Sequence, residues 1–148
     1  MARTIGSIVA GYLAMAALIF LLFSAAWLVL GVEGSFLPDS WTPATIWISV
    51  SIVVGLVASM AGGALCMAIA QDVRGPRWLV VVVVVLGLLM AIPAFTVPVG
   101  EPITRPETVS MMEAMSNARQ PAWLAVINPL LGAIGVIVGA AFVPRRDA

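Results

Sequence analysis

The sequence predicts an all-α, polytopic membrane protein: a four-helix up-down-up-down transmembrane bundle with a short amphipathic helix in the outer loop between the third and fourth helices. Three observations predict it: an apolar composition, four long uncharged runs and an uneven distribution of arginine. Hydrophobic residues make up 62% of the 148 residues, charged residues make up 9%, and the mean hydropathy is +1.13. A soluble domain carries about 25% charged residues, so lipid is the expected solvent of this chain.

The uncharged runs are each long enough for one membrane crossing. They contain 29 residues after Arg3, 32 after Asp39, 23 after Arg77 and 25 after Arg119. Roughly 20 helical residues span a hydrocarbon core about 30 Å thick. We therefore expect one transmembrane domain over residues 1–148, with membrane-spanning helices near 5–31, 44–70, 77–97 and 121–143.

The placement of arginine predicts the orientation of these helices. With the N-terminus in the cytoplasm, five of the seven basic residues lie on the cytoplasmic side, and Arg105 and Arg119 lie outside. An excess of basic residues in cytoplasmic loops is the usual determinant of orientation. We expect a multi-pass protein of a bacterial inner (plasma) membrane with cytoplasmic N- and C-termini.

Small residues form the most regular pattern inside the predicted spans. They recur at every fourth position of the 44–70 helix and on a similar, less regular face of the 121–143 helix. The two sets are Ser51, Gly55, Ser59 and Gly63, and Gly132, Gly135 and Gly139. Such faces let another helix backbone approach closely. Two interpretations are open: the helices pack against one another through these faces, or the faces form an interface to another subunit.

The predicted spans carry few reactive groups. The chain has no histidine and one cysteine, Cys66, so it offers neither an imidazole nor a cysteine pair. Proton-coupled transporters normally keep a carboxylate or a cation at membrane depth, and neither lies inside these spans. We therefore expect no enzymatic activity, no cofactor and no bound metal. The seven basic and seven acidic residues balance, which argues against a nucleic-acid partner.

The most polar feature within the spans is the pair Asn128-Pro129, about two turns into the 121–143 helix. Pro129 cannot donate a hydrogen bond to the carbonyl group of Ala125. The Asn128 amide can satisfy that region, hydrogen-bond a neighbouring helix or line a small cavity. Asn128 is therefore the polar intramembrane candidate.

The loop over 98–120 contains a predicted helix at about 106–119. Pro106 suits the first turn of a helix, and Glu107 interacts favourably with the helix dipole there. Its apolar face consists of Val109, Met111, Met112 and Met115. We expect this face to lie on the membrane, cap the bundle or dock a partner. A thioether site for Cu(I) is disfavoured because no histidine or cysteine lies nearby.

These features favour a non-catalytic accessory or scaffold subunit that packs through its small-residue faces. We expect membrane lipid around the chain, and a homo-oligomer or a larger membrane complex as the assembled state. The alternative is an oligomeric transporter, channel or carrier of an apolar ligand, with its path near Asn128-Pro129.

Overall fold

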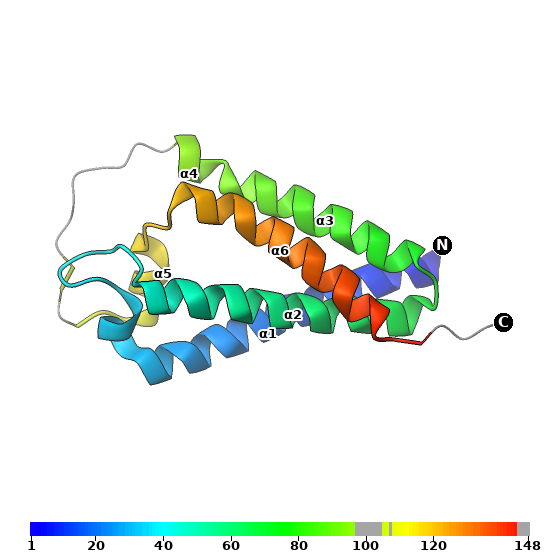
Figure 1. Ribbon diagram of the computed structural model, residues 1–148, viewed down its shortest axis with the longest axis horizontal. Helices are drawn as coiled ribbons and strands as arrows, with labels where there is room; N and C mark the ends of the chain where they lie inside the picture. The colour runs from blue at the N-terminus through cyan, green and yellow to red at the C-terminus, as the bar shows by residue number, and fades with distance from the viewer. Residues whose placement is uncertain (97–104, 107, 145–148) are drawn as a thin grey trace.

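The computed structural model describes residues 1–96, 105–106 and 108–144, and Figure 1 shows how its helices are arranged. Within these residues the elements are α1 (Ala2–Ser35), α2 (Thr45–Ala70), α3 (Arg74–Ala91), α4 (Pro93–Thr96), α5 (Met111–Asn117) and α6 (Ala122–Ala141). The described part of the chain is all-helical and contains four apolar helices long enough to cross a membrane. The four are α1, α2, α3 continued by α4, and α6. They are consistent with a multi-pass integral membrane protein.

Two spans begin and end close to the predicted residues, and two differ at their ends. α2 and α6 each begin one residue later than predicted. α1 continues to Ser35 because Gly31, with φ 61° and ψ −167°, forms a kink after which the helix resumes. α3 begins three residues earlier than predicted, so Gly75 and Pro76 lie in its first turn, where proline is tolerated. It ends before Pro93, which begins the short helix α4.

The outer-loop helix is shorter than the sequence indicated. It was predicted at about 106–119, and α5 extends only from Met111 to Asn117. Its N-cap is Ser110, whose Oγ accepts a hydrogen bond from the backbone N–H of Glu113 at 3.2 Å. Serine followed three residues later by glutamate is the capping-box pattern, which is the better predictor of this start. Glu107 lies outside the described residues.

The four long helices form two pairs. α1 packs along α2, and α3 packs along α6, while α2 and α6 join the two pairs. The pairs cross near the end of the molecule that holds the N-terminus, and they separate towards the opposite end, where α5 lies (Figure 1). The end of α6 lies on the same side as the N-terminus.

Small residues allow the helices to approach closely where the pairs cross. A Cβ atom added at Gly63 of α2 would lie 2.7 Å from the Cα of Val136 in α6. A Cβ added at Gly135 would overlap the side chain of Ser59, and one added at Gly139 would overlap the backbone of Met60. Backbone contact of this kind explains why glycine occupies these positions.

Two apolar clusters stabilise opposite ends of the structure. The first lies where the pairs cross and consists of Met15, Cys66, Leu79, Val83 and Val136. The second consists of Phe36, Trp41 and Ala114, with Trp27, Val32, Val109 and Ala118 packed against it. It holds α5 against the end of α1 and the segment that follows α1. The space between the two clusters is where the helix pairs diverge.

Candidate functional site

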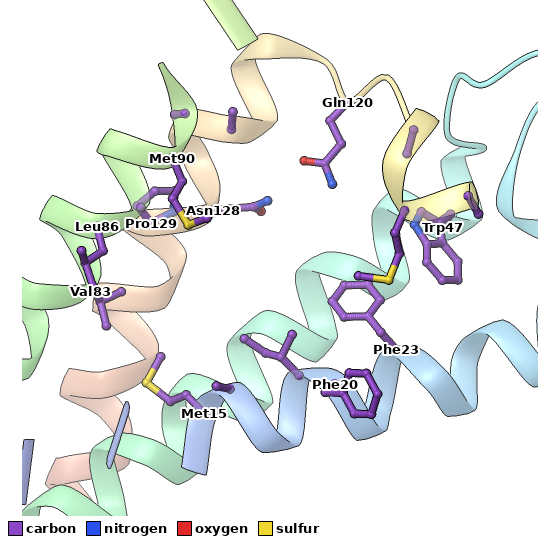
Figure 2. Close-up of a pocket in the computed structure, with 18 of the residues that line it drawn as sticks. Met15, Phe20, Phe23, Trp47, Val83, Leu86, Met90, Gln120, Asn128 and Pro129 are labelled. Carbon is purple, nitrogen blue, oxygen red and sulfur yellow. The ribbon is translucent and has the colours of Figure 1, made fainter. Parts of the chain in front are cut away.

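A cavity of about 690 Å³ lies between the separated helix pairs (Figure 2). Ligand-binding cavities typically measure about 300–1,000 Å³, so its size suits a small molecule or part of a lipid. Its walls come from α1, α2, α3, α5 and α6. In Figure 2, Phe20 and Phe23 of α1 lie across the open space from Leu86 and Met90 of α3.

The walls are rich in two kinds of apolar side chain. Four of the eight methionines of the chain line the cavity: Met15, Met90, Met111 and Met115. Six aromatic residues also line it: Tyr12, Phe20, Phe23, Trp27, Phe36 and Trp47. Methionine adapts its shape to a partner, and aromatic rings offer large, rigid apolar surfaces. This combination suits a flexible apolar ligand.

The cavity exists because each helix pair is closed by contacts of its own. On one side, Trp47 of α2 packs against Phe23 and Trp27 of α1, with ring centroids 5.6 and 6.2 Å apart. On the other side, Gly87 of α3 packs against Pro129 of α6, where an added Cβ would lie 2.7 Å from the proline Cβ. Between the crossing and α5, the described apolar residues of one pair that face the cavity therefore do not pack against residues of the other pair.

The floor of the cavity is the contact between α1 and α3. A Cβ atom added at Gly11 would lie 3.0 Å from Cδ2 of Leu79, and Met15 belongs to the same cluster as Val83. Beyond this contact the side between α1 and α3 is open, since Phe20 is 63% exposed and Met90 is 80% exposed. In a membrane this opening would face the lipid chains.

Two amides provide the polar groups at the cavity. Asn128, which the sequence singled out, projects from α6 into the open space, and Gln120 lies nearer the end at which α5 lies (Figure 2). No described residue forms a hydrogen bond with either side-chain amide. Pro129 also leaves the carbonyl of Ala125, another lining residue, without its usual donor four residues along the helix.

The predicted apolar face of the outer helix divides between three surroundings. Met111 and Met115 line the cavity at the end where α5 lies, and Val109 packs in the cluster around Trp41. Met112 is 72% exposed. The face therefore does not form one continuous surface, and half of it belongs to the cavity wall.

The small-residue faces lie largely inside the chain. Ser59, Gly63, Gly135 and Gly139 are buried at the crossing of α2 and α6. Ser51 is 8% exposed and donates its hydroxyl hydrogen bond to the carbonyl of Trp47 at 2.7 Å. A Cβ at Gly132 would lie 3.0 Å from Val83, whereas one at Gly55 would have no heavy atom within 4 Å.

The sequence did not identify the lining residues of α1 and α3. Phe20, Phe23 and Trp27 share one face of α1 at helical spacing, but an apolar face towards a cavity has the same composition as one towards lipid. Asn128 was recognisable because a polar side chain inside a span needs a reason to be there.

No charged side chain is among the described lining residues, so the groups they offer are apolar surfaces and uncharged hydrogen-bonding groups. Within the described ranges, no cluster of three or more His, Cys, Asp or Glu residues is arranged to hold a metal ion. Comparison with protein-family models, curated proteins and solved structures finds no match to this chain.

Proposed function

We propose that this chain is a membrane-embedded binding protein or carrier for an apolar ligand, which it holds in the cavity between the α1–α2 and α3–α6 pairs. The observation that carries the proposal is the cavity of about 690 Å³ with its methionine-rich and aromatic walls. Water gains little in an apolar cavity, where it finds few hydrogen-bond partners. A hydrocarbon chain fills the same space favourably, because it contacts the apolar walls closely.

The proposed orientation places this cavity in the outer half of the membrane. The four spans then run up-down-up-down with cytoplasmic termini, in the plasma membrane. Support comes from the described charges: Arg3, Arg74 and Arg77, with Asp72 as the one described acid, lie at the end that holds the N-terminus. The opposite end carries Glu33, Asp39 and Glu113 beside Arg105 and Arg119, and so has the lower positive charge.

The proposed entry path runs sideways from the lipid, between α1 and α3. Phe20 and Met90 flank that opening and are largely exposed. α5 covers the outer end of the same space through Met111 and Met115. A ligand that arrives from the membrane would therefore reach Asn128 without crossing the aqueous phase.

An accessory or scaffold role stays a prediction. It rested on small-residue faces available to another subunit, and the contacts of Ser59, Gly63, Gly135 and Gly139 are made within the chain. Gly55 is the exception, since an added Cβ there meets no described heavy atom within 4 Å. The observed contacts support the ligand-binding proposal more directly than assembly with a partner.

A matched pair of substitutions on α1 tests the proposal. Ala16 and its neighbour Ala17 are both exposed, but only Ala16 lines the cavity. Ala16→Phe should fill the space, and Ala17→Phe should add the same ring to the outer surface. Purified protein in detergent would be titrated with a long-chain dibrominated alkane, whose bromine atoms quench tryptophan fluorescence on contact.

The tryptophans of the cavity report binding once the exposed ones are removed. Trp78 and Trp123 are 59% and 52% exposed, so W78F/W123F is the parent background. Trp27 and Trp47, which line the cavity, remain together with Trp41, which is buried and does not line it. We expect saturable quenching in this parent and with A17F, and only weak, linear quenching with A16F. Equal, non-saturable quenching in all three proteins would refute the proposal.

A further inference from the structure

Building on the proposed function, we infer that the cavity selects a neutral amphiphile: a long apolar chain whose head carries an uncharged hydroxyl or carbonyl oxygen, held by the Asn128 amide. The inference names the class of ligand within the same cavity. It rests on the polar groups that the cavity offers and on the charges that it lacks.

Asn128 presents hydrogen-bonding groups to which no described residue bonds. Its side chain is half-buried, points into an apolar space and has no hydrogen-bond partner among the described residues. A polar group in apolar surroundings without a partner is unfavourable, and a ligand oxygen removes that cost. The amide can donate through Nδ2 and accept through Oδ1.

The residue that follows Asn128 adds a second acceptor. Because Pro129 has no N–H, the carbonyl of Ala125 lacks its helical donor, and Ala125 also lines the cavity. A hydroxyl group can donate to such a carbonyl while it accepts from the Asn128 amide. Gln120 supplies a second neutral amide towards the outer end.

A charged head finds no compensating charge among the described residues that line this cavity. The described lining residues include no acid and no base. Arg105 is not among them, and its side chain, only 3% exposed, pairs with Glu33 at 3.0 Å. An unpaired ion in low-dielectric surroundings is strongly disfavoured, whereas a hydroxyl or carbonyl needs only the hydrogen bonds available here.

The depth of Asn128 strengthens this preference. It lies six residues after Ala122, the first residue of α6, which places it roughly 9 Å along the helix at 1.5 Å per residue. In the proposed orientation the head would be bound below the outer membrane surface, away from water. The chain of the ligand would then extend towards Met15 and Val83 at the floor.

A head-group series on one brominated chain tests the inference in the W78F/W123F background. The probes are the alcohol, the methyl ketone, the carboxylate, the trimethylammonium compound and the unsubstituted alkane. One net hydrogen bond strengthens binding about three- to ten-fold, so the alcohol and ketone should bind tighter than the other three by that factor.

Asn128→Leu should lower the affinity for the alcohol and the ketone towards the affinity for the alkane. Asn117→Leu is the matched control, because Asn117 is exposed on α5, bonds to the carbonyl of Glu113 and does not line the cavity. Asn117→Leu should retain the preference. The head-group series on the parent protein tests the inference even if N128L does not fold.

The outcomes separate the inference from the proposed function. Saturable binding of all five probes with equal affinity would overturn the inference and leave the apolar cavity as a site for any lipid chain. Tighter binding of the carboxylate or the trimethylammonium compound would also overturn it. No saturable binding of any probe would refute the proposed function itself.

Discussion

Replacing Gly63 by alanine should weaken the crossing of α2 and α6, whereas the same replacement of Gly55 should not. Both glycines lie on the regular small-residue face of α2. A Cβ at Gly63 would lie 2.7 Å from the Cα and 2.8 Å from the carbonyl carbon of Val136. A Cβ at Gly55 would meet no described heavy atom within 4 Å. The two substitutions therefore add the same methyl group, which clashes with α6 at position 63 and meets no described atom at position 55.

The expected magnitude follows from two effects of opposite sign. Alanine favours a helix over glycine by about 0.8–1 kcal/mol, and both variants gain this. Only G63A meets backbone atoms, which cannot rotate away: the nearest is the carbonyl oxygen of Val136, followed by its Cα at 2.7 Å, so α2 and α6 must move apart to restore ordinary contact. Overpacking of this kind costs about 1–3 kcal/mol. G63A should therefore be less stable than G55A by about 1–3 kcal/mol.

The single cysteine of the chain provides the assay. Cys66 is 0% exposed and lies in the cluster that joins the helix pairs. It should react with a maleimide only after that cluster opens. The labelled fraction, followed across an SDS titration in mixed micelles, gives the free energy of unfolding of each variant.

Tryptophan fluorescence would provide a second measure of unfolding that is independent of the cysteine. The midpoint should fall for G63A relative to G55A in both measurements. If the two variants unfold at the same SDS fraction, the close crossing of α2 and α6 is not what holds the pairs together, and the explanation of the glycine pattern is wrong.

Two further predictions concern the membrane orientation and the outer loop. The first is tested in intact cells that express the protein with Cys66 replaced by serine. There S116C should react with a membrane-impermeant maleimide and D72C should not, because the two exposed positions lie at opposite ends of the bundle. The reverse pattern would invert the proposed orientation. Glu33→Gln should loosen the chain at Arg105, whose buried guanidinium pairs with Glu33 at 3.0 Å. Because Glu33 is itself 77% exposed, the free energy of unfolding should fall by roughly 1 kcal/mol or less. Hydrogen exchange should become faster in α5. Unchanged exchange there would mean that the ion pair does not anchor the loop.

The spans followed directly from the sequence because the membrane imposes length and polarity on each helix separately. A helix of about 20 apolar residues is required whatever its neighbours do, and α2 and α6 accordingly begin one residue from their predicted starts. Errors arose where backbone conformation decided the end. Gly31 kinks α1 instead of ending it, and Ser110 rather than Pro106 begins the outer helix.

The candidate site was predictable only where it is polar. Asn128 stood out because an amide inside a span is unusual, and the structure places it at the cavity. The aromatic and methionine walls could not be assigned from composition, because lipid, a neighbouring helix and a cavity all favour apolar residues.

The sequence by itself determined how many apolar helices the chain has, where they lie and which positions are small enough for close approach. Only the tertiary structure decided that the small residues bring α2 and α6 into contact near one end of the bundle. Near the other end, Trp47 packs against α1 and Pro129 packs against α3, so each pair is held together separately. The divergence that leaves the cavity depends on contacts between residues distant in sequence, such as Gly63 with Val136 and Gly87 with Pro129. A local pattern specifies the face of one helix, but its partner and crossing angle depend on the shapes of both.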